Sequence, residues 1–366
     1  MGEGIAMDQN DLNREMMKKR IYDGFKGLTD LPYFEMTKGG LLRLTLDGLD
    51  GGIDGHTHLA LNSLLGLKPD LQISTLKTEY YIEADDRLSL NVYMNRNQTP
   101  LDKRKMTRNT MLQMMPVRNI AAKTHTIPNL LAEMDLLNID KAILLPIKSG
   151  FPFGDNMTEW YLSEIEKSGK KDRFIVCCSV KPTLKDSPKK IEEYKLKGFK
   201  GIKMHPNFAR FFPNDRAAWP SYEAAEKNKM PVLIHCGRTG QEPKKGIAKK
   251  LYSEDYADIS NFSEPVAAFP NVRFVFCHSG ALQNEQAIRI AKENNNVWMD
   301  VQGQSIDNIR KMIDELGPER LMFGSDFPFY PLATILARTL VATENDKKVR
   351  KMIFSENAKR FWGIDS

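Results

Sequence analysis

Cysteine is scarce in this chain of 366 residues, and long apolar segments are missing. The four cysteines, Cys177, Cys178, Cys236 and Cys277, lie within short apolar runs of strand character, and none belongs to a Cys-x-x-Cys pair. Reduced, buried thiols usually occupy such positions, so we expect no disulfides. No stretch approaches the roughly 18 apolar residues of a membrane span, and the N-terminus lacks the basic-then-apolar pattern of a signal peptide. We therefore expect a cytoplasmic protein that does not enter membranes.

A large excess of one charge sign is also missing. The chain has 53 basic and 47 acidic residues, a formal net charge of +6, and the two signs are spread along it rather than gathered in one tail. A charge this small for the length gives no reason to expect nucleic acid as a partner. With 41% hydrophobic and 27% charged residues, the composition is that of a globular protein with a large core.

Short apolar runs alternate with longer segments of helical periodicity, which is typical of parallel strands joined by helices. The predicted strands are 51–58, 141–147, 173–180, 200–205, 231–236, 272–278, 297–302 and 320–326. The predicted helices are 128–138, 156–168, 187–197, 216–228, 260–268, 282–294, 305–316 and a C-terminal helical tail at 331–361. This alternation predicts an α/β fold, the (β/α)8 TIM barrel, in which active sites form at the C-terminal ends of the strands.

Two segments fall outside the alternation. Residues 1–50, with a helix predicted at 11–26 and a strand at 41–46, are interpreted as an N-terminal extension that packs on the barrel, against its N-terminal face. The barrel itself is assigned to 51–366. Residues 62–127 form a long insertion after the first strand, and so long a connection is usually functional or has structure of its own. Because it leaves the end of that strand, we expect it to lie over the active site.

The insertion carries a basic, methionine-rich stretch that begins at Lys103 and continues to Arg118. One interpretation is a solvated helix whose methionines cover the barrel. The other interpretation is a lid over the active site. In it, the side chain of Arg118 or of a neighbouring residue binds a substrate carboxylate, which a guanidinium does through two hydrogen bonds.

Five of the six histidines and one aspartate stand at the ends of predicted strands. They are His56, His58, His205, His235, His278 and Asp326. Side chains alternate faces along a strand, so His56 and His58 point the same way. Imidazole and carboxylate are ligands that zinc prefers, so the pattern predicts a metalloenzyme. If these groups only bonded to one another, many buried donors and acceptors would stay half satisfied. The sixth histidine, His125, is expected at the surface or as a helix cap.

These motifs resemble a known family. The run 54–58 (Asp-Gly-His-Thr-His), the histidines ending strands 5 and 6, and the run 324–326 (Gly-Ser-Asp) are similar to the amidohydrolase superfamily. Gly-Ile-Lys-Met-His-Pro at 201–206 and Gly-Ser-Asp-Phe-Pro at 324–328 resemble its branch of predicted metal-dependent TIM-barrel hydrolases and aminocarboxymuconate semialdehyde decarboxylase. The resemblance covers roughly residues 51–361 and leaves the extension and the insertion unexplained.

The resemblance implies that His56, His58, His235 and Asp326 bind one divalent metal, most simply Zn²⁺. It further implies that His278 serves as acid or base beside the metal, while Asp326 takes a proton from the metal's water. Catalytic zinc sites keep one position open for that water. Strand 4 departs from the best-studied pattern, because His205 stands where a carboxylated lysine or glutamate would bridge two metals. A single metal is therefore preferred over a second one held through Lys203.

His205, Lys203 and three arginines are further candidates, which would contact a small-molecule substrate. Two readings of His205 remain open, because it either lines the site or only donates to a buried carbonyl. Arg238, Arg210 and Arg118 are candidates for binding a substrate carboxylate, and each has an ordinary alternative as a surface arginine.

The predicted metal centre suits more than one reaction. Metal-activated water predicts hydrolysis of an amide, lactone or ester, which we prefer because nothing in the motifs demands a carboxylate substrate. The same centre suits non-oxidative decarboxylation of an unsaturated or aromatic acid, and a metal-holding binding protein without activity is a third alternative. A homodimer is expected because barrels of this type often pair through their outer helices, although no residue of the sequence indicates it.

Overall fold

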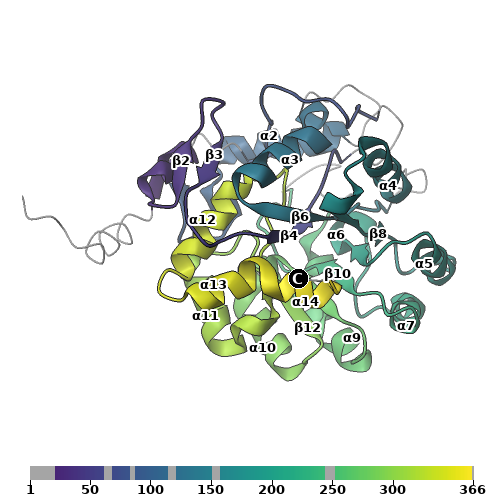
Figure 1. Ribbon diagram of the computed structural model, residues 1–366. Coiled ribbons are helices and arrows are strands. Elements are labelled where there is room, and N and C mark those ends of the chain that lie inside the picture. Colours follow the sequence, from purple (N-terminus) through teal and green to yellow (C-terminus); the bar gives the residue numbers. More distant parts are fainter. Residues whose placement is uncertain are drawn as a thin grey trace, which may run out of the picture.

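The chain folds as a TIM barrel, with a ring of parallel strands surrounded by helices (Figure 1). The computed structural model describes residues 21–61, 68–82, 87–113, 121–150, 157–243 and 252–364. The barrel strands are β4 (Gly52–Thr57), β6 (Ile139–Leu144), β7 (Phe174–Val176), β8 (Cys178–Ser179), β9 (Ile202–Met204), β10 (Val232–His235), β11 (Phe274–Cys277), β12 (Val297–Asp300) and β13 (Leu321–Met322). Because β7 and β8 are two halves of one strand, the eight predicted strands are confirmed.

Backbone hydrogen bonds close the ring of strands. One parallel sheet runs β4-β6-β7, and the other runs from β8 through β9, β10, β11 and β12 to β13. The first and last strands meet where Gly55 N donates to Phe323 O at 2.9 Å and His58 N donates to Phe327 O at 2.6 Å. All barrel strands therefore point the same way, and their C-terminal ends share one rim.

Helices follow the strands as the alternation predicted. They are α3 (Ile127–Leu136), α4 (Met157–Ser168), α5 (Ser187–Leu196), the short α6 (Pro206–Ala209), α7 (Trp219–Lys227), α9 (Ser263–Ala268), α10 (Asn284–Glu293), α11 (Ile306–Leu316) and α12 (Leu332–Ala342). Side-chain caps fix several starts: Thr126 accepts from Asn129 N in α3, and Ser305 accepts from Asn308 N in α11. Gly317, at φ +82°, ends α11.

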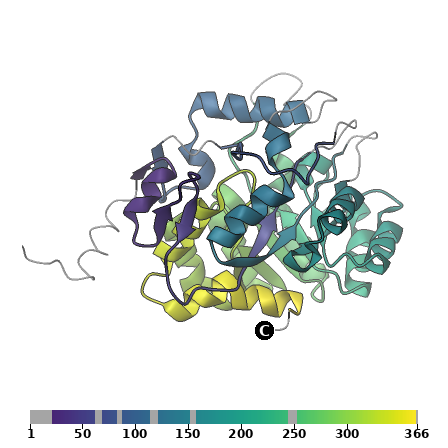
Figure 2. The ribbon, with the colours of Figure 1, turned by 45° about the horizontal axis from the view of Figure 1, so that its top comes forward.

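The last helices cover the N-terminal end of the barrel. They are α13 (Lys347–Lys351) and α14 (Asn357–Trp362), joined by a π-helical turn at Met352–Glu356, and in Figure 2 they lie at the bottom of the molecule. Phe361 packs in one cluster with strand residues such as Ile53 and Leu233. A Cβ on Gly52 would lie 2.3 Å from Cζ of Phe354, so only glycine allows this close approach. These helices occupy the face that we expected the N-terminal extension to cover.

The described part of the N-terminal extension instead runs along the side of the barrel. Strand β1 (Ile21–Asp23) pairs antiparallel with β5 (Arg87–Ser89) of the insertion. Strands β2 (Phe34–Met36) and β3 (Leu42–Leu44) form a hairpin, which confirms the strand predicted at 41–46. The helix predicted at 11–26 lies mostly outside the described residues, and it is wrong at its end because residues 21–23 form β1.

The insertion crosses the rim at the C-terminal ends of the strands. Asn95 Nδ2 donates to Thr239 O, beyond β10, and Met94 N donates to Gly303 O, beyond β12. Its helix α2 (Pro100–Gln113) lies on the opposite side of the molecule from the C-terminal helices (Figure 2). The basic stretch therefore forms a helix as expected, while Met114, Met115 and Arg118 lie outside the described residues.

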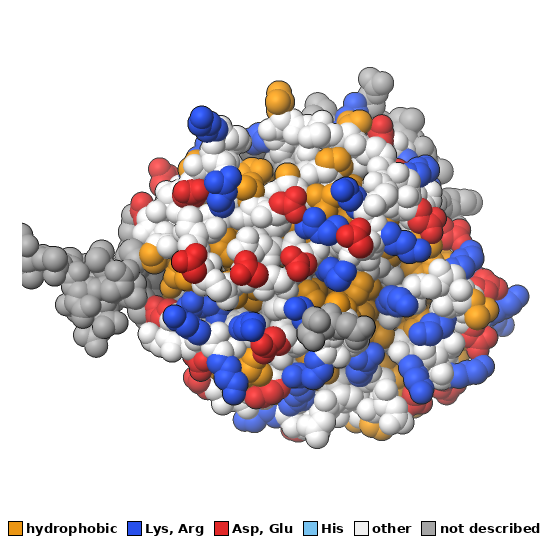
Figure 3. Space-filling view, in the orientation of Figure 1, with side chains coloured by type: hydrophobic (Ala, Val, Ile, Leu, Met, Phe, Trp, Pro, Cys, Tyr) orange, Lys and Arg blue, Asp and Glu red, His pale blue; other side chains and the backbone are white. Residues whose placement is uncertain are grey.

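The cysteines, the surface charges and the lengths of the helices can be compared with the sequence. All four cysteines are buried and free, as expected. Basic and acidic side chains are interspersed over the face that Figure 3 shows. In the described ranges, no helix combines the length and the apolar character needed to cross a membrane.

Candidate metal centre

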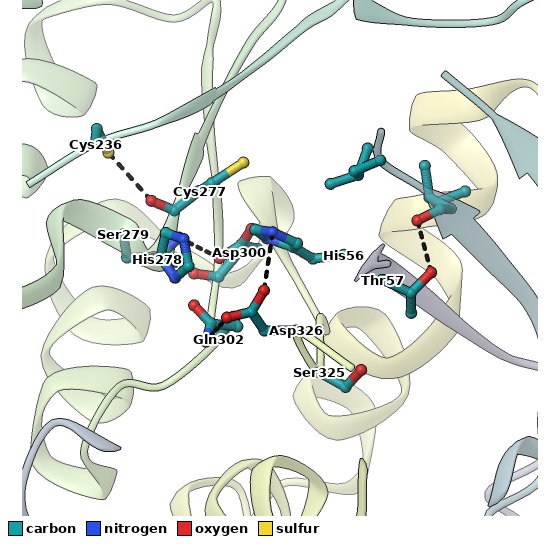
Figure 4. Close-up of polar contacts among 12 residues, drawn as sticks. His56, Thr57, Cys236, Cys277, His278, Ser279, Asp300, Gln302, Ser325 and Asp326 are labelled. Carbon is teal, nitrogen blue, oxygen red and sulfur yellow. Dashed lines mark hydrogen bonds and ion pairs between the residues drawn. The ribbon is translucent and has the colours of Figure 1, made fainter. Parts of the chain in front are cut away.

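Polar side chains from four barrel strands converge at the rim. His56 and His58 come from the end of β4, His278 follows β11, Asp300 ends β12 and Asp326 follows β13. All five are buried, and Figure 4 shows His56, His278, Asp300 and Asp326 turned toward one another. The strand ends therefore deliver these groups to one place, as the barrel geometry predicts.

Three possible ligand atoms in this group lie close to one another. Asp326 Oδ1 lies 3.4 Å from His56 Nε2 and 3.2 Å from His58 Nε2. These three residues each offer one ligand atom, and all three atoms lie within 4.8 Å of one another. A single cation placed among them would contact all three.

The outer nitrogens of both imidazoles are already bonded. His56 Nδ1 lies 2.9 Å from Asp300 Oδ2, and His58 Nδ1 lies 2.5 Å from Leu145 O. Both partners are acceptors, so each Nδ1 carries the proton and each Nε2 presents a lone pair. Two lone pairs therefore face a carboxylate oxygen, an arrangement that a shared cation stabilises.

Burial keeps the imidazoles of His56 and His235 neutral. Desolvation, together with the positive charge of Lys203, holds the pKa of His56 well below 6.5, and the same two causes lower the pKa of His235. Desolvation raises the pKa of Asp326, and it raises the pKa of Asp300 to about 7. Neutral imidazoles are the form that binds metal, so the centre is prepared for a cation at neutral pH.

Lys203 lies inside the barrel next to His56. Its Nζ is 3.3 Å from His56 Nε2 and 3.2 Å from Cys277 Sγ. His56, Cys277 and Asp300 also lie close enough to form a second ligand group. Burial, however, raises the pKa of the Cys277 thiol to about 12, and Asp300 already accepts the His56 proton. Hydrogen bonds therefore account for this second group, which favours one metal over two.

His205 and His235 form a stacked pair beside the three ligand atoms. Their ring centroids are 4.0 Å apart at an interplanar angle of 12°. His205 Nδ1 accepts from Phe208 N, so it caps the short helix α6 and does not donate to a carbonyl there. Asn207 Nδ2 lies 3.4 Å from His235 Nε2, while His235 Nδ1 has no partner. His205 thus orients His235 by stacking.

His278 is held by its backbone and leaves its ring partly unpaired. Its N–H donates to Asp300 Oδ1 at 2.7 Å, and its ring lies 5.0 Å from His56 and 4.5 Å from His235 between centroids. Its Nδ1 has no hydrogen-bond partner. His278 and Asp326 both have positive φ, +64° and +63°. Such backbone conformations cluster at active sites, where surrounding structure enforces them.

The comparison with protein families identifies the chain. The amidohydrolase family profile matches residues 53–364. The chain belongs to the amidohydrolase family. The comparison with curated protein sequences found no match.

Solved structures with the same barrel support the family at the level of the fold. A 5-carboxyvanillate decarboxylase from Novosphingobium aromaticivorans, complexed with manganese and a nitrobenzoic acid, has a TM-score of 0.58 at 15% identity, covering 86% of this chain and 96% of its own. A 2,6-dihydroxybenzoate decarboxylase complexed with 2,6-dihydroxybenzoate has a TM-score of 0.53 at 18% identity, covering 70% and 95%. A probable 2-pyrone-4,6-dicarboxylic acid hydrolase from Acinetobacter baumannii has a TM-score of 0.53 at 13% identity, covering 86% and 100%.

The structure describes two of the three arginines that were predicted to bind substrate in this amidohydrolase. Arg238 forms ion pairs with Asp255 at 2.6 Å and Asp258 at 2.8 Å, so its guanidinium is already neutralised. Arg210 is exposed and ends α6 with φ +57°. Arg118 lies outside the described residues.

His125, which was expected at the surface or as a helix cap, is buried, and its Nε2 lies 2.7 Å from Glu79 O.

Three residues that shape the amidohydrolase centre were not among the sequence predictions. Asp300 orients His56, Gln302 Nε2 donates to Asp326 Oδ2 at 3.1 Å, and Asn207 approaches His235. Asp300 lies near the end of the predicted strand 297–302 and ends the observed strand β12, and its place near a strand end was the available signal. Gln302 follows β12 in a turn and Asn207 lies in the short helix α6, and no spacing distinguishes them. Glycine is also needed at position 324, next to His56. A Cβ on Gly324 would lie 2.8 Å from Cβ of His56, which is too close.

Proposed function

We propose that this amidohydrolase binds one divalent metal and hydrolyses an amide, lactone or ester of a small organic substrate. The ligands in this proposal are His56, His58, His235 and Asp326. The observation that carries it is the convergence of two Nε2 lone pairs on one carboxylate oxygen, within 3.4 Å. Because most of these donors are imidazoles, we propose Zn²⁺ as the metal.

The bound metal would lower the pKa of a water toward about 7 and polarise a substrate carbonyl. We assign Asp326 the role of taking the proton of the attacking water, and the hydrogen bond from Gln302 Nε2 to its Oδ2 would orient the carboxylate for this role. His278 lies beside His56 and His235 with Nδ1 unpaired. We assign it the role of stabilising the developing oxyanion or protonating the leaving group.

Hydrolysis is preferred over decarboxylation because, of the two candidate carboxylate-binding arginines that the structure describes, one is already paired with acidic side chains and the other is exposed. Arg238 is neutralised by two aspartates and Arg210 is exposed. The second candidate is a non-oxidative decarboxylase of an aromatic or unsaturated acid. It is favoured by one observation, that two of the three barrels compared above are decarboxylases of aromatic acids.

The test uses the full chain, purified without added metal and then loaded with zinc. Aryl esters, lactones, amides and aryl carboxylic acids are offered in parallel, and acid release and carbon dioxide release are recorded separately. We expect zinc-dependent acid release and about one zinc per chain. Carbon dioxide release without acid release would support the second candidate. Zinc binding without either product would support the metal-holding protein instead.

Two variants make this test specific to the centre. His56→Ala removes one Nε2 lone pair, so we expect zinc content and turnover to fall together. His125→Ala is the matched control, because it removes a buried histidine that bonds to Glu79 O away from the ligands. Full zinc content and activity in His56→Ala would contradict the ligand assignment.

A further inference from the structure

Tyr93 stands out because its hydroxyl is buried and has no hydrogen-bond partner among the residues that the structure describes. The residue lies in the insertion between β5 and the 3-10 turn Met94–Asn97, and only 5% of it is exposed. Its OH is shielded from solvent and makes no hydrogen bond within the described part of the chain. Leaving such a group unpaired is destabilising, so a buried hydroxyl of this kind requires an explanation.

The backbone around Tyr93 is held on both sides. Arg338, from α12, donates to Val92 O at 2.7 Å and to Ser89 O at 2.8 Å. On the other side, Met94 N donates to Gly303 O at 2.7 Å. The ring of Tyr93 is therefore presented at a fixed position rather than on a free loop.

That position is next to the metal-centre loop after β12. A Cβ on Gly303 would lie 2.9 Å from Cε2 and 3.6 Å from the hydroxyl of Tyr93, and Gly303 adopts φ +70°. Gly303 directly follows Gln302, whose amide donates to Asp326 Oδ2. The Tyr93 ring thus packs against the segment that orients a proposed metal ligand.

The electrostatic surroundings keep this hydroxyl protonated. Burial, then the neighbouring Tyr330, then the carboxyl group of Asp326 raise the pKa of Tyr93 well above 10. The neighbouring Tyr330 donates its own hydroxyl proton to Asn95 Oδ1, and no hydrogen bond joins the two tyrosines. A protonated phenol that finds no acceptor among the described residues can donate its proton to another molecule.

We propose that Tyr93 is a specificity-determining residue that donates its hydroxyl proton in a hydrogen bond to an oxygen of a planar, aromatic substrate at the metal centre. This inference rests on the proposed function, and it names the substrate class. An aromatic substrate fits the neighbouring rings: Phe329 lies edge-on to His58 at 6.0 Å and Phe208 edge-on to His205 at 4.5 Å between centroids. A site built to bond an oxygen rejects an analogue that lacks it.

The experiment compares Tyr93→Phe with the wild type in the zinc-loaded full chain. The variant removes only the oxygen and keeps the ring against Gly303. The probes are 4-nitrophenol and nitrobenzene, a pair that differs in one oxygen, and the dissociation constants are measured by titration calorimetry. We expect Tyr93→Phe to weaken 4-nitrophenol binding about 5- to 30-fold and to change nitrobenzene binding less than about twofold.

Tyr222→Phe is the matched control, because its hydroxyl donates to Pro213 O at 3.0 Å, within the fold. It should alter thermal stability and leave both dissociation constants unchanged. Equal 4-nitrophenol affinities for the wild type and Tyr93→Phe, or no 4-nitrophenol binding to zinc-loaded wild type, would overturn the inference. Absence of bound zinc in the wild type would count against the proposed function instead, and it is measured first.

Discussion

His56 Nδ1 lies 2.9 Å from Asp300 Oδ2, although the two residues stand 244 positions apart in the chain. This contact decides which nitrogen of His56 carries the proton. Because the proton stays on Nδ1, the Nε2 lone pair is directed at Asp326 and at any cation between them. Asp300 also accepts from the backbone N–H of His278, so one carboxylate orients two residues of the centre.

Replacing Asp300 with Asn should weaken zinc binding. The Asn amide would donate to His56 Nδ1, forcing the proton to Nε2 and removing the lone pair from the centre. We expect zinc affinity to fall about 10- to 100-fold, measured by competition with a chromogenic chelator. Asp314→Asn, on the exposed face of α11, is the control and should bind zinc normally. Unchanged affinity in Asp300→Asn would mean that this contact does not control the tautomer.

Replacing His278 with Asn should separate metal binding from catalysis. Asn tolerates the positive φ of this position better than alanine, so the variant should fold. We expect normal zinc content, measured by elemental analysis, and turnover lower by about 10²- to 10⁴-fold. Loss of zinc from His278→Asn would instead indicate that His278 is a metal ligand. Wild-type turnover in this variant would show that His278 has no catalytic role.

Replacing Arg338 with Met should loosen the insertion from the barrel. The arginine is fully buried and donates to the carbonyls of Ser89, Val92 and Gln304, so its loss leaves buried acceptors unpaired. We expect the free energy of unfolding in urea to fall by about 3 kcal/mol. Arg289→Met, on the exposed face of α10, should change it by less than about 0.5 kcal/mol. Equal unfolding midpoints for the two variants would contradict this role.

Glu133 should make stability depend on pH. It accepts from Tyr80 OH at 2.5 Å and from Leu332 N at 3.1 Å, and burial raises its pKa from 4.5 to about 7. Between these values the unfolded chain releases the proton and the native chain keeps it, so this group lowers stability as pH rises. Urea denaturation measures the free energy of unfolding at pH 5 and at pH 8. The decrease of this free energy from pH 5 to pH 8 should be smaller in Glu133→Gln than in the wild type, by up to about 3 kcal/mol. An equal decrease in both proteins would exclude the effect.

The strands and most helices could be predicted because their signals are local. Runs such as Val-Leu-Ile-His at 232–235 bury every side chain, and the predicted range 231–236 contains the observed strand. The end of the 11–26 prediction failed for a tertiary reason. Residues 21–23 become a strand because they pair with β5 of the insertion, a partner that local periodicity does not reveal.

The sequence by itself determined the order of strands and helices and the placement of histidines and Asp326 at strand ends. Those features follow from hydrophobic periodicity, which each segment carries within its own residues. Only the tertiary structure decided which polar atoms meet: Asp300 with His56, two aspartates with Arg238, and Tyr93 with the loop after β12. Such pairs form when the barrel closes and brings distant strand ends and the insertion together. The spacing of these residues along the chain does not reveal the distances between their atoms in space.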